Sequence, residues 1–222
     1  MNCLELFSGT QSVGKILKEK GYNVISVDIT DYNKKHTPTH KVNILDFDYK
    51  QYPVGHFDII HASPPCVSYS AIQRSQLGRM IRGGIWTQER MEEGRKEGDK
   101  LVKKTLEIID YFKPRLWTME NPQTGELKRR DFMIERNLPY YDIDYCMYSD
   151  WGYRKRTRFW TNIKDFNPKL CNKKCYKFTD NKHPIQIGRP RNILGFKQST
   201  LSRYRIPPKL LKDLYNLNND IL

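Results

Sequence analysis

Residues 3–28, CLELFSGTQSVGKILKEKGYNVISVD, decide the fold, because they contain a strand, a tight turn, a helix and a second strand in that order. The runs CLELF and NVISVD are short and rich in apolar, β-favouring residues, which is typical of buried strands. Between them, Val13, Ile16 and Leu17 recur at the spacing of one helical face. Gly21 then follows a basic last turn, as a C-cap glycine does. This stretch therefore predicts a βαβ unit on a parallel sheet.

The same alternation continues along the chain and predicts an α/β fold with a mostly parallel sheet. Strands are expected at 3–7, 23–28, 41–46, 58–63, 115–120, 141–148 and 156–162. Helical patterns cover about 101–112 and the C-terminal IPPKLLKDLYNL. Two stretches lack a sustained apolar period. We interpret residues 72–98 as a long mobile loop able to close over a substrate, and residues 163–192 as an irregular insertion.

Composition indicates the partners and the compartment. A chain of 222 residues is long enough to bury its own core as a single domain, 1–222. Its formal net charge of +14 attracts polyanions, so nucleic acid is the first partner to expect. No basic signal region and no long apolar stretch is visible, so we expect neither secretion nor a membrane span. Five scattered cysteines fit reduced thiols in a cytosol-like compartment.

Small and polar residues follow the first three expected strands. The turn FSGTQSVG, residues 7–14, leads into a helix N-terminus, where nucleotide-like ligands sit in open α/β sheets. Asp28 ends the second strand about 20 residues later, a spacing that suits an acid accepting hydrogen bonds from ribose hydroxyls. A helix N-cap is the alternative for Asp28. Asn43 is expected either to pair with an adenine edge or to be an ordinary polar residue of an edge strand.

The fourth strand runs into Ser63-Pro64-Pro65-Cys66, where two prolines fix the backbone and present the thiol at the same sheet edge. A buried structural cysteine is the alternative. The polar run Ser68-Tyr69-Ser70 that follows argues against an apolar core, so we expect Cys66 to be a nucleophile.

Two further motifs are expected beside that thiol. The fifth strand ends in Met119-Glu120-Asn121-Pro122, and a carboxylate there suggests a partner that handles protons. The last strand opens with Arg154, Arg156 and Arg158 on one face. If that face points into the crevice, it binds an anion or an acceptor oxygen and helps to hold Cys66 as thiolate. A solvated basic edge is the alternative.

The motifs LFSGTQSVG, SPPC, MENP, YRKRTRFW and IPPKL, in this order and spacing, resemble the cytosine-5 DNA methyltransferase family. The resemblance covers nearly the whole chain apart from residues 72–98 and 163–192. It implies a Rossmann-like, S-adenosylmethionine-dependent methyltransferase fold, with a mostly parallel seven-stranded sheet and helices on both faces. The cofactor-binding residues that it implies are Phe7, Ser8, Gly9, Thr10, Asp28, Ile29, Asn43, Ile44 and Pro65. The catalytic residues that it implies are Cys66, Glu120, Asn121, Arg156 and Arg158.

The family resemblance also implies a mechanism. The Cys66 thiolate adds to carbon 6 of a cytosine flipped out of the DNA, and carbon 5 then becomes nucleophilic enough to take the methyl group. Glu120 at ring nitrogen 3 and Arg158 at the carbonyl oxygen stabilise the developing charge, and Asn121 orients Glu120. The sequence does not identify the base that removes the carbon-5 proton.

Departures from the family pattern concern the cofactor edge and specificity. Gln11 replaces a common Gly, Arg154 replaces a Gln, and Tyr204 stands near the position of an Asn that contacts the cofactor in relatives. A separate target recognition domain is absent, so recognition is expected to be short, relaxed or supplied by a partner. The compact form resembles phage and viral enzymes, which act in the cytoplasm of a bacterial or virus-infected cell. RNA as the substrate, or a nonenzymatic DNA-binding relative, are the alternatives.

Cys171, Cys175 and His183 suggest a metal site, since C-x3-C with a nearby His supplies three ligands. A structural zinc site takes four protein ligands, and the sequence shows no fourth. We therefore interpret these cysteines as ordinary loop thiols near a basic surface and expect no metal.

Overall fold

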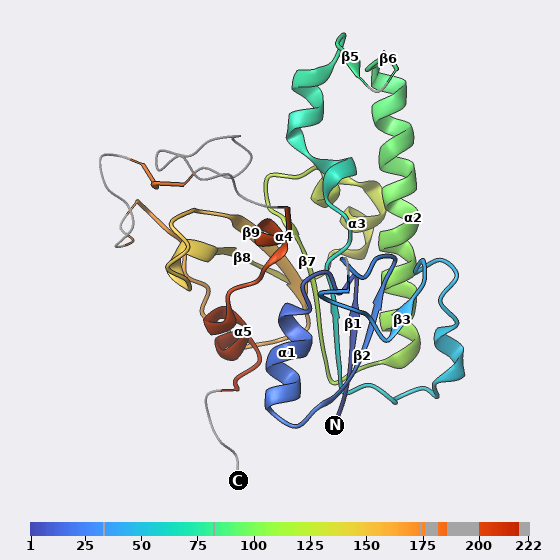
Figure 1. Cartoon of the computed structure of the whole chain (residues 1–222), viewed down its shortest axis with the longest axis vertical. Helices are drawn as coiled ribbons and strands as arrows, with labels where there is room; N and C mark the ends of the chain where they lie inside the picture. Colours follow the sequence, from blue (N-terminus) through green and yellow to red (C-terminus); the bar gives the residue numbers. More distant parts are fainter. Residues whose placement is uncertain (33, 82, 174, 176–181, 186–199, 218–222) are drawn as a thin grey trace.

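The computed structural model describes residues 1–32, 34–81, 83–173, 175, 182–185 and 200–217. Seven strands form one sheet in the order β3-β2-β1-β4-β7-β9-β8 (Figure 1). Their bounds are Asn2–Leu6 for β1, Asn23–Asp28 for β2, His40–Lys41 for β3, Ile59–Ala62 for β4, Leu116–Pro122 for β7, Tyr140–Asp144 for β8 and Arg156–Thr161 for β9. Neighbouring strands from β3 to β7 pair in parallel, and β9 is antiparallel to both β7 and β8. The expected mostly parallel, seven-stranded sheet is confirmed.

Helices cover both faces of the sheet (Figure 1). Alternation along β1 sends Leu4 and Leu6 into one core and Cys3 into the other. The core around Leu4 and Leu6 is closed by α2 (Gln88–Phe112) and α3 (Asp131–Arg136). The core around Cys3 is closed by α1 (Ser12–Glu19) and α5 (Pro208–Leu214). This is the Rossmann-like methyltransferase architecture that the resemblance implies.

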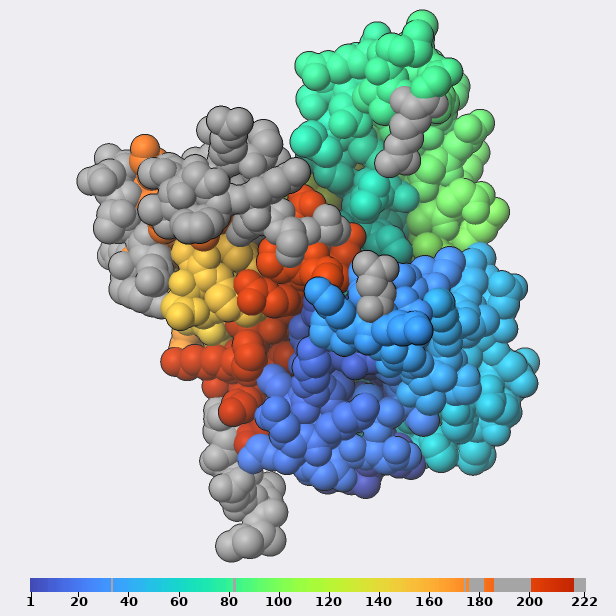
Figure 2. Space-filling model, in the orientation of Figure 1, coloured from blue at the N-terminus to red at the C-terminus, as the bar shows by residue number. Residues whose placement is uncertain are grey.

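The prediction of a long loop over 72–98 is wrong. Residues 88–98 are the first turns of α2, and the Thr87 hydroxyl accepts a hydrogen bond from the backbone N–H of Arg90 at 3.3 Å, capping the helix. A 3-10 turn at Ala71–Gln76 and a hairpin of β5 (Met80–Ile81) and β6 (Gly84–Ile85) precede the helix. We call residues 71–98 the arm. In Figure 2 the arm, coloured teal to green, projects beyond the body of the molecule.

The third and sixth expected strands are shorter than predicted. After β3 the side chain of Asn43 accepts a hydrogen bond from the N–H of Leu45 at 3.0 Å, and this turn ends the strand. Residues 145–147 form a 3-10 turn, η5, instead of continuing β8. The described residues of the expected insertion form no helix and no strand, while 174, 176–181 and 186–192 lie outside the described residues. Nor does any helix in the described parts combine the length and apolar character needed to cross a bilayer.

Candidate active site at the carboxyl edge of the sheet

A buried carboxylate organises the turn after β1. Glu5 accepts hydrogen bonds from the backbone N–H groups of Val13 and Gly14 at 3.0 and 3.1 Å, so a strand residue satisfies the first amides of α1. Position 14 requires glycine, because a Cβ there would lie 2.5 Å from the Glu5 carboxylate. Burial raises the pKa of Glu5 to about 7. The sequence analysis missed this residue, although an acid inside the apolar run CLELF is the signal for it.

The structure brings Asp28 to the turn. Its carboxylate accepts hydrogen bonds from the N–H of Gly9 at 2.8 Å and from the N–H of Thr30 at 3.0 Å. No helix begins directly after Asp28, so the N-cap alternative does not hold. Phe7 and Gly9 have positive φ angles of 54° and 49°, and this sharp turn carries the backbone amide of Gly9 to the carboxylate.

Unsatisfied and exposed groups next to Asp28 suit a nucleoside ligand. The Ser8 hydroxyl is buried and has no hydrogen-bond partner among the described residues. Ile29 is 68% exposed, leaving an apolar surface beyond Asp28. By contrast, Ile44 is buried in the core, and the side-chain oxygen of Asn43 bonds to Leu45. These two residues have less free surface for a ligand than the sequence analysis expected.

The remaining expected cofactor-binding residues also lie at this edge of the sheet. The hydroxyl of Thr10 lies 2.9 Å from that of Ser12, and Pro65 is exposed in the loop after β4. The ring of Tyr204 meets that of Tyr32 edge to face at 6.3 Å, which places the C-terminal segment beside the loop after β2. The turn, Asp28 and Pro65 therefore share one side of the molecule with the thiol described next.

The loop that carries Cys66 is held at both ends. The side-chain NH2 of Asn121 donates to the carbonyl of Pro64 at 3.0 Å, and the N–H of Tyr69 donates to the carbonyl of Cys66 at 3.1 Å. Asn121 is fully buried, and its contact with Pro64 corrects the expectation that it orients Glu120. The half-buried thiol thus sits on a braced loop, as the two prolines predict.

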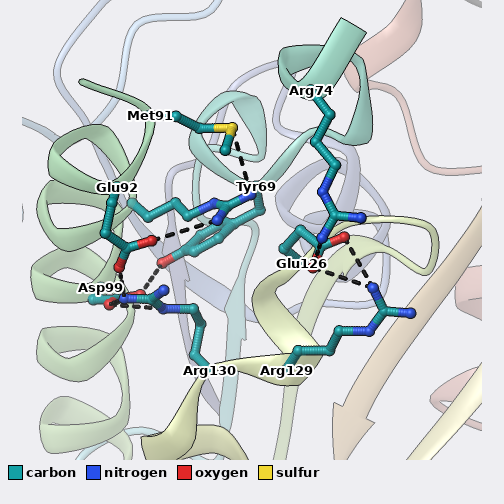
Figure 3. A network of polar contacts seen from close by, with 9 residues as sticks. Tyr69, Arg74, Met91, Glu92, Asp99, Glu126, Arg129 and Arg130 are labelled. Carbon is teal, nitrogen blue, oxygen red and sulfur yellow. Dashed lines mark hydrogen bonds and ion pairs between the residues drawn. The ribbon is translucent and has the colours of Figure 1, made fainter. Parts of the chain in front are cut away.

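Beyond Cys66 the bracing continues into a polar network between the arm and the segment after β7 (Figure 3). The Tyr69 hydroxyl donates a hydrogen bond to the carboxylate of Asp99 in α2 at 2.8 Å. The guanidinium of Arg130 donates to the same carboxylate at 2.6 Å. A Cβ at Gly98 would lie 3.0 Å from the Tyr69 hydroxyl, so the close approach of helix and loop needs a glycine there. Glu126 pairs with Arg74 of the arm at 3.1 Å. The Arg74–Glu126 pair thus ties the arm to the segment after β7, and the Tyr69–Asp99 bond ties the thiol loop to α2.

Glu120 faces Lys155. The Lys155 ammonium donates to Oε1 of Glu120 at 3.1 Å, and the hydroxyl of Tyr145 donates to the same oxygen at 3.3 Å. Glu120 is 6% exposed, so the pair is well shielded from solvent. Neither Lys155 nor Tyr145 is among the site residues expected from the sequence.

Arg156 and Arg158 do not contact this carboxylate, and each is paired with an aspartate of β8 instead. Arg156 forms a two-point ion pair with Asp144, and Arg158 forms one with Asp142. The strand register explains why the arginines do not contact Glu120. Glu120 lies opposite Phe159 of β9, so every second residue counted from Phe159 points to the same side of the sheet as Glu120. That side holds Lys155, while the arginines lie on the opposite side.

The electrostatic surroundings of Cys66 are mixed. Burial, and then the charge of Glu120, raise the pKa of the Cys66 thiol, whereas Lys155 and Arg203 lower it. The net direction is upward, so the two cations offset the other effects only in part. Arg203 comes from α4 (Thr200–Tyr204), so the C-terminal segment contributes to the field at the thiol.

A family model described as C-5 cytosine-specific DNA methylase matches residues 1–131, which include the turn, Asp28, Cys66 and Glu120. The chain belongs to this family. Over 227 aligned residues it is 38% identical to the protein of Frog virus 3 (isolate Goorha) named "Probable DNA (cytosine-5)-methyltransferase", covering 98% of this chain and 100% of that protein. The similarity to this viral protein thus extends through the C-terminal segment, beyond the part that the family model matches.

The methylase also resembles a solved structure from E. coli whose description reads "putative DNA modification methyltransferase encoded within prophage". The TM-score is 0.47 at 15% sequence identity, and the match covers 77% of this chain and 51% of that one. The methylase therefore spans about half the length of that protein.

Away from the sheet edge, the methylase gathers four residues able to hold a metal. Cys171 and Cys175 are buried rather than being ordinary loop thiols, and they lie with His183 and Cys146 in one cluster. Cys146 is the fourth residue that the sequence analysis did not find, because it precedes the other three by a whole strand.

Proposed function

We propose that this methylase transfers a methyl group from S-adenosylmethionine to carbon 5 of a cytosine flipped out of DNA, through a covalent bond between Cys66 and carbon 6. Family membership makes the chain a DNA cytosine-5 methyltransferase. One observation carries the covalent step: the thiol of Cys66 lies on a braced loop within the field of Glu120, Lys155 and Arg203.

The residues at the turn fit the cofactor. S-adenosylmethionine supplies an electrophilic methyl group on a sulfonium ion. Asp28 is the acceptor for the ribose hydroxyls, because each of its oxygens has further lone pairs beyond the single hydrogen bond described above. The buried hydroxyl of Ser8 needs a polar partner, and the exposed side chain of Ile29 offers an apolar surface to the adenine ring.

The residues around the thiol fit the addition step. The Cys66 sulfur forms a bond to carbon 6, and the electrons of the C5=C6 double bond move through the ring toward nitrogen 3. Glu120 takes the proton that the Cys66 thiol loses and passes it to that nitrogen, and Lys155 stabilises the charge that develops on the base. We assign to Lys155 the electrostatic role that the resemblance gives to Arg158, because its ammonium lies 3.1 Å from Glu120. Carbon 5 then has enamine character and takes the methyl group. Loss of the carbon-5 proton and cleavage of the bond between carbon 6 and the Cys66 sulfur then restore the aromatic base and the free thiol.

Asn121 acts as a positioning residue in this scheme. It holds the carbonyl of Pro64, and through it the loop that presents the thiol. The net charge of +14 supports DNA as the polyanionic substrate. The reaction requires Cys66 to be a reduced thiol, so we place the enzyme in the cytoplasm of the cell that holds the DNA.

Trapping on DNA that carries 5-fluorocytosine tests the covalent step. Fluorine at carbon 5 cannot leave as a proton, so elimination stalls and the wild-type protein stays linked to the DNA. Cys66→Ala should abolish both the linked species, read by denaturing gel electrophoresis, and methylation, read by bisulfite sequencing. Binding of S-adenosylmethionine, measured by calorimetry, should be nearly unchanged in this variant.

The matched control is Cys3→Ala, which removes a buried thiol of β1 and should leave the trapping intact. Methylation of cytosine at carbon 5 by the Cys66→Ala variant would disprove the covalent mechanism.

A further inference from the structure

The four residues of the cysteine–histidine cluster come from separate parts of the chain. Cys146 lies in η5 (Tyr145–Met147), directly after β8, and the other three lie in the segment after β9. One ligand atom from each residue falls within 4.8 Å of all the others. A ring nitrogen of His183 is 3.1 Å from the sulfur of Cys175 and 3.6 Å from that of Cys171. The chain is thus folded so that three sulfurs and one imidazole nitrogen meet.

We propose that Cys146, Cys171, Cys175 and His183 bind one structural Zn²⁺ ion. Three thiolates and one imidazole form a closed tetrahedral set, typical of structural zinc. A Zn–S bond of about 2.3 Å places the sulfurs of a tetrahedral site about 3.8 Å apart. The four ligand atoms here, all within 4.8 Å of one another, are therefore close enough to share one ion. Sulfur and nitrogen ligands exclude magnesium and calcium, which take oxygen.

Burial distinguishes this cluster from a chance meeting of surface thiols. Cys146, Cys171 and Cys175 are 1%, 2% and 7% exposed, and none of them forms a disulfide. A disulfide would join only two of the three sulfurs and would leave the third, with the imidazole, without a role. Because four protein ligands fill the coordination sphere, the ion has a structural and not a catalytic function.

The surrounding contacts support such a site. Asp144, the last residue of β8, accepts a hydrogen bond from the N–H of Cys171 at 2.8 Å, and its own N–H donates to the carbonyl of Lys169 at 3.2 Å. The N–H of Lys169 donates to the hydroxyl of Tyr148 at 2.9 Å. These bonds hold Lys169 and Cys171 against the end of β8, as the outer contacts of metal ligands do.

The position of the site gives the ion a specific task. It joins the segment after β9 to the end of β8. It also fixes Cys146, whose neighbour Tyr145 donates a hydrogen bond to Glu120. Binding of zinc therefore stabilises both that segment and one contact of the active-site carboxylate, because its binding energy is also folding energy.

Metal analysis of the protein, purified under reducing conditions, tests the proposal. We expect one zinc ion per chain by inductively coupled plasma mass spectrometry, and none in the Cys146→Ala variant. Cys3→Ala is the matched control, since it also replaces a fully buried cysteine by alanine but lies in β1, and it should keep the zinc. Zinc retained in full by Cys146→Ala would overturn the ligand set.

Cobalt substitution keeps the test decisive if the Cys146→Ala variant does not fold. Wild-type protein refolded with Co²⁺ should show the intense visible bands of tetrahedral cobalt and sulfur-to-metal charge-transfer absorption, and zinc should abolish both. A strong chelator should lower the melting temperature of the wild-type protein. Wild-type protein that binds neither zinc nor cobalt after refolding in their presence would disprove the site.

Discussion

The reactivity of Cys66 is set first by burial and then by charges of opposite sign on its neighbours. Because burial and Glu120 raise the pKa of the thiol more than Lys155 and Arg203 lower it, Cys66 is protonated at neutral pH. The thiolate is the nucleophile, so its fraction limits the addition step. Methylation should consequently accelerate as the pH rises from neutrality toward the pKa of the thiol.

Replacing Lys155 by Met tests this view of the site. The change removes a cation that favours the thiolate and that stabilises charge on the base, so kcat/KM should fall about 100-fold. The pH profile of kcat/KM should also shift to higher pH. Initial rates of methyl transfer, measured from neutral to alkaline pH, give both quantities.

Arg158→Lys is the matched control for Lys155→Met. It weakens the two-point pair with Asp142 and should lower the melting temperature without moving the pH profile. A shifted profile in Arg158→Lys, together with an unshifted one in Lys155→Met, would restore the assignment made from the sequence.

The residues at the site show what the sequence could not decide. The motifs predicted that Asp28, Cys66 and Glu120 lie at one sheet edge, because parallel strands end there together. The orientation of the arginine run is harder to predict from the sequence. Alternation shows which residues share one side of β9, but it does not show which side faces Glu120. Only the pairing of β9 with β7 brings Lys155 to the carboxylate. Strand register depends on contacts distant in sequence, so no local pattern reveals it.

Among the elements, the helices differ in how visible they are in sequence. α1 has an apolar stripe because it packs on the sheet, and the spacing of Val13, Ile16 and Leu17 predicts it. The first turns of α2 belong to the arm and have no sheet beneath them, so they show no such stripe. Short-range ion pairs such as Arg95 with Glu92 accompany those turns. An apolar stripe is present only where a helix packs against the rest of the protein. It therefore cannot predict the part of a helix that extends beyond the body of the molecule.

Glu5 gives the β1–α1 unit a stability that depends on pH. Burial raises its pKa in the folded protein to about 7, against an ordinary value of 4.5. The folded state therefore holds the proton more tightly, and this contribution to stability is complete below the unfolded pKa and lost as the pH rises through the folded pKa. The loss amounts to about 3 kcal/mol, by the conversion of a pKa difference into free energy.

Glu5→Gln should remove this dependence. The free energy of unfolding by urea, measured at intervals from about pH 4.5 to about pH 7.5, should fall less steeply in the variant than in the wild type. The amide cannot accept at both of its atoms, so the variant should also lose part of the cap on α1. Equal slopes in the two proteins would show that Glu5 does not titrate in this range.

For the molecule as a whole, composition and motif order predicted the sheet and its function, but not the meeting of distant residues. Cys171, Cys175 and His183 are close in sequence and were recognised as a set. Cys146 is separated from them by β9, and it joins them only because β8 ends beside the segment that holds Cys171. Spacing in sequence carries no information about such tertiary contacts.

The basic charge of the whole molecule predicts salt-dependent binding to DNA. The affinity should fall linearly with salt on a double-logarithmic plot, because Lys and Arg displace the counterions of the phosphates. Arg79→Gln removes an exposed cation of the arm and should reduce the slope by about 0.9. Fluorescence anisotropy over a salt series measures this, and Lys50→Gln, which removes an exposed cation from the η1 turn (Tyr49–Gln51), should leave the slope unchanged. A flat salt response would show that the net charge is not used for DNA.

If the turn after β1 binds the proposed cofactor, we expect the carboxylate beneath α1 to limit which nucleotides can compete there. In many open α/β sheets the first helix presents its free N-terminal amides to a phosphate. Here Glu5 already occupies the amides of Val13 and Gly14, so a phosphate would have to displace a buried side chain, and the ionised form of Glu5 would also repel it. We therefore expect the turn after β1 to favour adenosine derivatives that end in a neutral or cationic group. Nucleoside diphosphates and triphosphates, although abundant in cells, would be poor competitors for it.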